Sequence, residues 1–209
     1  MPATAKRQLW LIVILFILAA VAVYFAYLRL RASNIQMAQG RQAYDAGKYA
    51  LAEDAYLRSV TVDQNNAEAW YWLGISRKNQ GKVASAAEAL IKATQLEPNN
   101  ANWWFESAQA LQWAERFSEA EQAWAKVQNL FLPDDPRVVQ ARINQAQCLA
   151  HHGDVERAIE MMKAMLATKD DPNIRCELAK VLGYAGRYEE SVQEFRRAFG
   201  ETPTNQPEK

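Results

Sequence analysis

The chain begins with an apolar segment and continues as a series of amphipathic ones. Residues 9–28, LWLIVILFILAAVAVYFAYL, contain no charged side chain. At about 1.5 Å per residue, a helix of this length spans roughly 30 Å, the thickness of a bilayer core. Trp10 stands near one end and Tyr24 and Tyr27 near the other, where interfacial aromatic anchors are expected. The pattern predicts a transmembrane helix over residues 9–30.

A cleaved signal peptide is the competing interpretation of this segment. Lys6 and Arg7 would form its basic region, and residues 20–22, Ala-Val-Ala, would form its cleavage site. The apolar run continues as far as Leu28, which favours a membrane anchor. No glycine or proline occurs between residues 4 and 39, so we expect the membrane helix to continue into the next helix with little or no break.

The segment of residues 67–100 has helical periodicity. Trp70, Leu73 and Arg77 are spaced to share one face of a first helix, and Gly81 follows where a left-handed residue ends a helix. A second helical face is formed by Ala86, Leu90 and Ala93. The pattern predicts two antiparallel helices that cannot bury their apolar faces alone and need neighbours.

Similar spacing recurs along the rest of the chain. The matching positions are Gly40, Gly47, Ala52 and Tyr56 in a first copy, Trp104, Ala108, Ala120 and Trp124 in a third, Gly153, Ala158 and Met162 in a fourth, and Leu178, Ala179, Gly186, Tyr188, Phe195 and Ala198 in a fifth. With Gly74 and Pro98 added, the unit at residues 67–100 resembles the tetratricopeptide repeat (TPR) family. Arg77 and Leu90 stand where that family usually has aromatic residues.

The resemblance implies an all-α fold: a right-handed superhelical solenoid of about five helix pairs, preceded by one transmembrane helix. The expected segments are a basic tail at 1–8, the transmembrane helix at 9–30, repeats at 33–66, 67–100, 101–134, 139–171 and 172–205, an insertion at 135–138, and a tail at 206–209.

Charge distribution narrows the classes of partner. Four of the 24 basic residues and none of the 24 acidic residues lie within residues 1–31, so the remainder carries a net charge of about −4. An acidic body argues against nucleic acid, which needs a basic surface. Basic residues flank both ends of the membrane helix, so the positive-inside rule comes close to a tie. The short basic tail resembles a bacterial signal-anchor, which would place the repeats in the periplasm.

The sequence carries no recognisable enzyme motif. Phosphate-binding loops, dinucleotide-binding glycine motifs, zinc-protease helices and nucleophile elbows are all missing. His151 and His152 are adjacent and point in different directions, which makes a poor metal site. Cys148 and Cys176 are the only cysteines, and whether they pair stays open. We expect no catalysis, no cofactor, no metal and no small-molecule substrate.

The candidate site is the face of the first helices that opposes the Trp70 face. In the TPR family this face lines a concave groove that holds a peptide. The predicted partner-binding residues are Tyr44, Tyr71, Lys78, Asn79, Phe105, Gln109, Trp113, Gln147, His151 and Tyr184. The same projection places Met37, Arg41, Ile75, Gln112 and Lys180 on this face. In the alternative interpretation, some of these aromatic residues pack between neighbouring first helices.

The resemblance therefore implies a single-pass scaffold of the bacterial inner membrane. It would bind a peptide segment of a partner protein during assembly of an envelope complex, of the kind that serves cytochrome c maturation, pili or polysaccharide secretion. The alternative is an accessory structural subunit held in a larger membrane complex by its transmembrane helix. Ala19, Ala22 and Ala26 form a small-residue side of that helix, which keeps this alternative open.

Overall fold

A computed structural model describes residues 3–200, with the side chains of Trp10 and of residues 12–200. These residues form ten α-helices and no strand, which confirms the predicted all-helical architecture. They divide into two compact units, one ending at Lys82 and one beginning at Val83. The predicted tail at 206–209 and the end of the fifth repeat lie outside the described residues.

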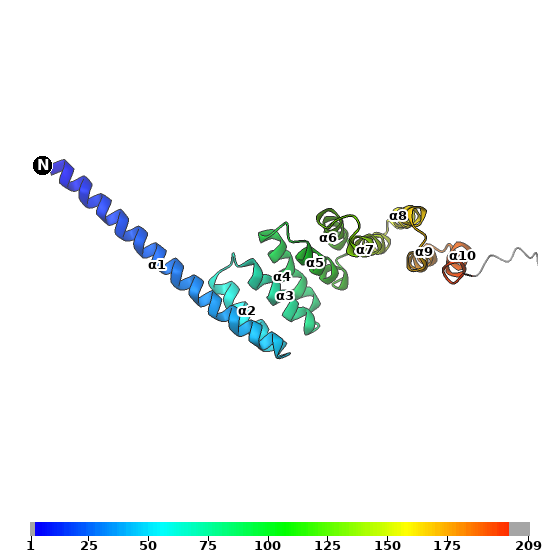
Figure 1. Cartoon of the computed structure of the whole chain (residues 1–209), viewed down its shortest axis with the longest axis horizontal. Helices are drawn as coiled ribbons and strands as arrows, with labels where there is room; N and C mark the ends of the chain where they lie inside the picture. Colours follow the sequence, from blue (N-terminus) through cyan, green and yellow to red (C-terminus); the bar gives the residue numbers. More distant parts are fainter. Residues whose placement is uncertain (1–2, 201–209) are drawn as a thin grey trace, which may run out of the picture. The chain divides into compact units, whose positions relative to one another are not determined.

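The first unit contains α1 (Ala3–Asp45), α2 (Tyr49–Val62) and α3 (Ala67–Asn79). Helix α1 has no break, as the lack of glycine and proline predicted. Figure 1 shows α2 and α3 beside the C-terminal part of α1 only. An 18-residue window of α1 has a mean hydropathy of 2.4, and none of it is buried. The helix is thus long and apolar enough to cross a membrane, a property that signal sequences share.

A buried polar contact joins the three helices of this unit. The hydroxyl oxygens of Ser33 on α1 and Ser59 on α2 lie 2.8 Å apart, and both side chains are fully buried. Asn66 Nδ2, just before α3, donates to Ser33 Oγ at 3.1 Å, while Asn66 Oδ1 accepts from the backbone N–H of Ala69. Asn66 therefore caps α3 and ties its start to α1.

Close packing continues about two turns further along α1. Gly40 faces the ring of Tyr56 on α2, and a Cβ atom at Gly40 would come within 2.6 Å of that ring. Trp72 of α3 stacks near the same ring, with centroids 6.4 Å apart and an interplanar angle of 19°. Tyr56 is completely buried. A residue without a side chain is therefore required at position 40.

The second unit consists of α4 (Val83–Leu96), α5 (Ala101–Trp113), α6 (Phe117–Leu130), α7 (Pro136–His152), α8 (Val155–Thr168), α9 (Pro172–Tyr184) and α10 (Tyr188–Ala198). Each helix packs against the next, and α7 also contacts α9 (Figure 1). Trp124, Met162 and Leu178 are among the largest fully buried side chains. First helices α7 and α9 thus lie near each other, which brings their exposed side chains onto one surface.

Helix starts follow the local chemistry of the sequence. Asn66, Asn100, Asp135 and Asp171 each accept a hydrogen bond from a backbone N–H in the first turn of the helix that follows. In α7 and α9 a proline occupies the first turn, where its missing N–H costs nothing. These signals set the starts of four first helices.

Two tryptophans at equivalent repeat positions each form a hydrogen bond to the connection that precedes their helix, α3 or α5. Trp70 Nε1 donates to the carbonyl oxygen of Gln64, and Trp104 Nε1 donates to that of Pro98, both at 2.9 Å. The two bonds span six residues each and lie 34 residues apart in the sequence. The internal repeat thus reproduces a side-chain contact as well as a helix spacing.

Candidate functional site

Three polar side chains on successive first helices form a hydrogen-bonded row, which we call the amide ladder: Gln112 of α5, Gln147 of α7 and Glu177 of α9. Gln112 Nε2 donates to Gln147 Oε1 at 3.1 Å, and Gln147 Nε2 donates to Glu177 Oε2 at 2.8 Å. Trp124 Nε1 donates to Gln112 Oε1 at 3.0 Å, and Lys180 Nζ donates to Glu177 Oε1 at 2.7 Å.

The ladder has a fixed polarity. An indole N–H can only donate, so Gln112 must turn its oxygen toward Trp124 and its NH₂ group toward Gln147. Glu177 can only accept when ionised, so Gln147 must turn its NH₂ group toward it. Each glutamine has two N–H groups, and these bonds use one of them. The second N–H of each amide is suited to a carbonyl oxygen of a bound chain.

Aromatic rings border the ladder. The ring of Phe117, at the start of α6, stacks on His151 of α7 with centroids 4.6 Å apart and planes 11° apart. The ring of Tyr184, at the end of α9, lies 5.8 Å from that of His151. Tyr184 is 75% exposed. Large, stiff rings of this kind give contact area at little entropic cost.

A small hollow lies between the ladder and the rings. Its volume is 210 Å³, and its lining residues are Gln147, Ala150, His151, Glu177, Lys180, Val181 and Tyr184. This is below the range of about 300–1,000 Å³ that is usual for small-molecule pockets. The hollow has the size of a place for one side chain of a larger partner.

The predicted positions in the first unit also gather. Asn79 Nδ2 donates to Tyr44 Oη at 2.9 Å, which joins α3 to α1. Tyr44 and Tyr71 both meet the ring of Trp72 edge-on, with centroids 5.1 Å and 5.3 Å away. Lys78 is half-buried on α3. Three aromatic rings and one amide therefore form a single cluster.

A second hollow lies beside this cluster, between α1 and the start of α3. It measures 560 Å³ and is lined by Asn34, Met37, Ala38, Arg41, Gln42, Asp45, Asn66 and Glu68. Arg41 Nη2 and Glu68 Oε1 form an exposed ion pair across it at 2.6 Å. Exposed pairs contribute little stability, so this one can exchange partners at low cost.

The remaining predicted residues differ in exposure. Phe105 packs edge-on against the buried ring of Trp124, with centroids 5.1 Å apart, and is only partly exposed. Gln109 is half-buried, and Trp113 is 55% exposed. The projection was wrong for Ile75, which is 6% exposed and belongs to the core.

Three residues of the candidate site were not predicted from the sequence: Trp72, Phe117 and Glu177. Trp72 follows Tyr71 in sequence, and a projection that assigned one face per helix excluded it. Glu177 lies three residues before Lys180, and this acid–base spacing was an available signal. No sequence signal places Phe117 against His151, because that contact depends on the angle between α6 and α7.

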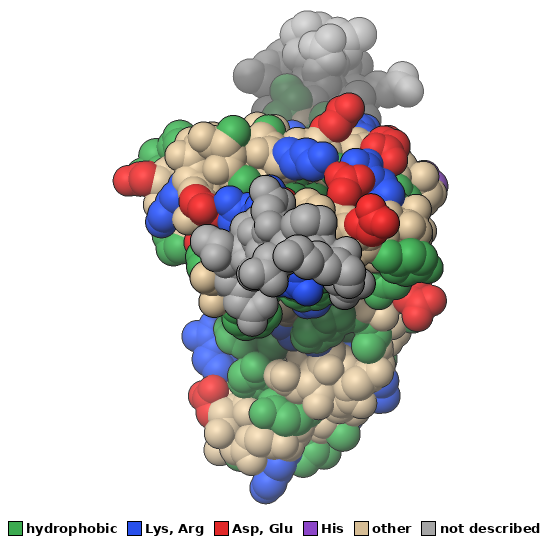
Figure 2. Space-filling view, turned by 90° about the vertical axis from the view of Figure 1, so that its right-hand side faces the viewer, with side chains coloured by type: hydrophobic (Ala, Val, Ile, Leu, Met, Phe, Trp, Pro, Cys, Tyr) green, Lys and Arg blue, Asp and Glu red, His purple; other side chains and the backbone are tan. Residues whose placement is uncertain are grey.

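Titratable chemistry is sparse. No group of three or more metal-ligating side chains occurs within residues 12–200. Cys148 is a buried free thiol, and burial raises its pKa to about 12, which makes it unreactive. On the face shown in Figure 2, Lys and Arg side chains lie among Asp and Glu side chains. The described surface on that side lacks the uniform positive charge that nucleic acid needs.

Comparison with known proteins agrees with the helical pattern. One profile of the tetratricopeptide repeat family matches residues 67–100, and a second matches residues 37–77 and 108–173, about half of the chain. No curated protein matches the sequence.

Among solved structures, MamA is 20% identical and has a TM-score of 0.67, with 81% of this chain and 91% of MamA covered. A MamA fragment from Desulfovibrio magneticus RS-1 is 15% identical with a TM-score of 0.65, covering 84% and 98%. YrrB, described as a TPR protein with an unusual peptide-binding site, is 17% identical with a TM-score of 0.64, covering 79% and 84%. At these identities the similarity establishes the fold alone.

Proposed function

Because the chain belongs to the tetratricopeptide repeat family, whose members bind protein or peptide partners, we propose that it is a membrane-anchored scaffold. It binds an extended segment of a partner protein along the amide ladder of α5, α7 and α9. The observation that carries this proposal is the ladder itself, a row of two oriented amides and one carboxylate that continues across three repeats.

The ladder suits a peptide backbone. The unused N–H groups of Gln112 and Gln147 can donate to successive carbonyl oxygens of an extended chain, while their bonds to one another hold them in place. Preorganised groups lose less side-chain entropy on binding. The hollow beside Tyr184 takes one side chain of the segment. A peptide-binding site in YrrB, a protein of the same fold, supports this use of the surface.

The first unit adds a second contact region. Tyr44, Tyr71, Lys78 and Asn79 bind the same class of partner, because aromatic rings with a neighbouring amide offer contact area and hydrogen bonds together. The protein does not act as an enzyme. Its partner is a protein, and no nucleic acid, small-molecule substrate or cofactor is needed.

Helix α1 anchors the scaffold in the inner membrane of a bacterium through residues 9–30, and the repeats lie in the periplasm. The length and apolar composition of α1 support the anchor. The bound segment belongs to a component of an envelope complex during its assembly. Protease added to the outer side of spheroplasts should digest the repeats, whereas protection of the repeats would reverse the orientation.

A crosslinking experiment tests the binding face. A photoreactive amino acid replaces Tyr184, next to the ladder, or Tyr188, on α10, in the full-length protein in cells. The two tyrosines are 75% and 71% exposed, so Tyr188 is a matched control for surface accessibility. We expect a discrete crosslinked partner from position 184 and none from position 188.

Substitutions then measure the contribution of the ladder. Gln147→Ala should weaken retention of that partner about fivefold or more, as the loss of an interface contact worth ~1 kcal/mol would. Gln193→Ala, an exposed glutamine on α10, is the matched control and should have no effect. Equal effects of the two substitutions would contradict the proposal. Retention that depends only on α1 would favour the accessory-subunit function, for which Ala19, Ala22 and Ala26 provide a packing side.

A further inference from the structure

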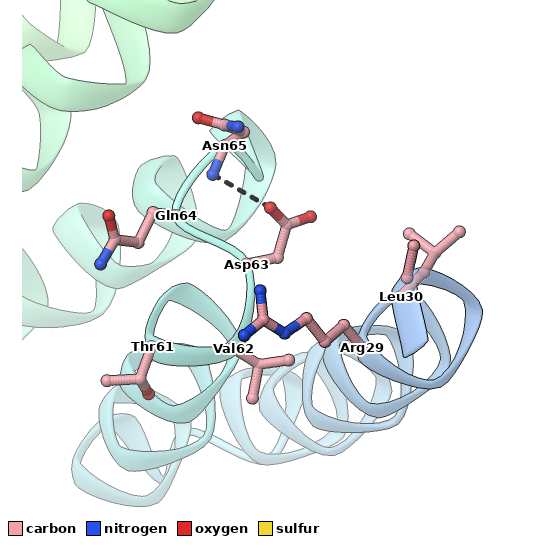
Figure 3. A pocket seen from close by; sticks show the side chains of 8 residues that line it. Arg29, Leu30, Thr61, Val62, Asp63, Gln64 and Asn65 are labelled. Carbon is pink, nitrogen blue, oxygen red and sulfur yellow. Dashed lines mark hydrogen bonds between the residues drawn. The ribbon is translucent and has the colours of Figure 1, made fainter. Parts of the chain in front are cut away.

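A polar hollow lies where α1 leaves its apolar segment. Its volume is 670 Å³, and it is lined by Ala26, Arg29, Leu30, Thr61, Val62, Asp63, Gln64 and Asn65. The first three residues belong to α1, and the others form the end of α2 and the connection to α3. Figure 3 shows the side chain of Arg29 extending from α1 toward this connection. All of these residues lie in the first unit, so the hollow is complete within it.

The position of the hollow along α1 fixes its depth relative to a membrane. Residues 9–28 are uncharged, and Arg29 is the first charged residue after them. If α1 spans the bilayer as proposed above, Arg29 lies at the level of the phospholipid headgroups. Residues 61–65, at the end of α2 and in the connection that follows, face Arg29 across the hollow and therefore lie at the same level. The lipid headgroup layer is the natural source of a ligand here.

The lining combines one cation with one anion. Arg29 is exposed and makes no ion pair with any described residue, so its guanidinium can bind a phosphate. Asp63 Oδ1 accepts from the backbone N–H of Asn65 at 3.0 Å (Figure 3), which leaves its second oxygen for another donor. The hydroxyl of Thr61 donates to carbonyl oxygens within α2, so its hydrogen is already used and does not bind the ligand.

The connection is held in one conformation. The carbonyl of Gln64 accepts from Trp70 Nε1 at 2.9 Å, and the backbone N–H of Asn66 donates to the carbonyl of Asp63 at 3.2 Å. Asp63 is thus fixed on one side of the hollow while Arg29 projects from the other. Groups of opposite charge on two sides of a hollow favour a ligand that carries the complementary charges.

We propose that this hollow binds the headgroup of a zwitterionic phospholipid that carries a primary ammonium, the phosphoethanolamine class. The phosphate oxygens accept hydrogen bonds from Arg29, and the ammonium donates to the unused oxygen of Asp63. An anionic headgroup such as phosphoglycerol would satisfy Arg29 and be repelled by Asp63. Free phosphate would face the same repulsion. The inference rests on the proposed membrane anchor.

Titration of the full-length protein in detergent micelles tests this assignment. The probes are short-chain phosphatidylethanolamine, short-chain phosphatidylglycerol and inorganic phosphate. The indole N–H resonance of Trp70 reports on the connection because that group bonds to Gln64. We expect saturable binding of phosphatidylethanolamine, weaker binding of phosphatidylglycerol, and no shift with inorganic phosphate.

Variants separate the two contacts. Arg29→Gln should weaken binding of phosphatidylethanolamine about fivefold, the upper end for one exposed charge pair, whereas Arg31→Gln, which removes a charge outside the hollow, should not. Asp63→Asn should abolish the preference for phosphatidylethanolamine over phosphatidylglycerol. Equal effects of the two arginine substitutions, or an unchanged preference in Asp63→Asn, would overturn the assignment.

Membrane extraction distinguishes failure of the headgroup assignment from failure of the proposed membrane-anchored scaffold. Protein that alkaline carbonate releases from membranes has no anchor, which would overturn both the scaffold and the headgroup site. Protein that resists extraction but lacks the headgroup preference overturns the headgroup site alone. A resonance shift with inorganic phosphate would replace the lipid by a free anion and refute the assignment.

Discussion

Replacing Gly40 by alanine should loosen α1 from α2. In the structure a Cβ atom at this position would lie 2.6 Å from Cε1, 2.8 Å from Cδ1 and 2.8 Å from Cζ of Tyr56. Real carbon atoms do not approach so closely, so the ring or the helix must shift. Tyr56 is completely buried and stacks on Trp72, and the ring therefore has no space into which to move.

The magnitude follows from two opposing effects. Overpacking of a filled core costs about 1–3 kcal/mol, and three clashing ring atoms place this site near the upper end. Alanine is a better helix former than glycine by about 1 kcal/mol, which offsets part of the cost. The expected net destabilisation of the contact between α1 and α2 is about 2 kcal/mol. Helix propensity alone predicts that Gly40→Ala stabilises the protein.

Amide hydrogen exchange of the full-length protein in micelles measures this local stability. The amides of residues 33–45 should exchange about thirtyfold faster in Gly40→Ala, which corresponds to ~2 kcal/mol. Gln39→Ala adds an alanine at the adjacent, exposed position and should leave exchange unchanged. In the double variant Gly40→Ala/Tyr56→Leu, the shorter side chain removes two of the three clashing atoms, so the two costs should not add. Unchanged or slower exchange in Gly40→Ala would refute the reasoning.

Two further predictions concern a charge cluster and a turn. Burial raises the pKa of Glu53, but bonds from Lys82, Arg77 and Gln80 outweigh burial and lower that pKa below its ordinary value. The stability that ionised Glu53 contributes is therefore present above its unfolded-state pKa and is lost as the pH falls through its folded-state pKa. Glu53→Gln should lower the free energy of unfolding by about 1 kcal/mol or more at neutral pH and by almost nothing well below pH 4. Urea unfolding at each pH measures this difference. An equal cost at both pH values would contradict the assignment. Glu115 has a φ of 58° in the turn between α5 and α6, where the equivalent residue in other turns is glycine, so Glu115→Gly should stabilise the second unit by about 0.5–1 kcal/mol in thermal unfolding. Glu115→Ala keeps the strain and should give no gain; a gain equal to that of glycine would argue against strain.

Local signals in the sequence were sufficient for the fold. The absence of glycine and proline between residues 4 and 39 predicted the continuity of α1, and Gly81 with Pro98 indicated where two helices end. Such features act within a few residues of the chain, because capping groups and glycine conformations affect only the adjacent turn. The repeat spacing then supplied the number of helix pairs.

The candidate site was harder to predict, because it depends on how each helix is rotated about its axis. Spacing alone placed Ile75 on the same face as Tyr71, yet Ile75 is buried while Tyr71 reaches Trp72. The amide ladder joins Gln147 to Glu177 across 30 residues rather than across one repeat period. Which residue of α9 faces α7 is determined by core packing, for which a single sequence carries no direct signal.

The unbroken α1 helix joins its apolar N-terminal segment to the first repeat as one continuous helix. A hinge would let the repeats swing while the anchor stayed still, but no residue between the two segments relaxes the helix. Contacts of Ser33 and Gly40 hold the C-terminal part of α1 against α2, so a tilt applied at one end of the helix is transmitted toward the other. If α1 spans a bilayer as proposed, a force applied to α2 or α3 changes the angle of α1 within that bilayer.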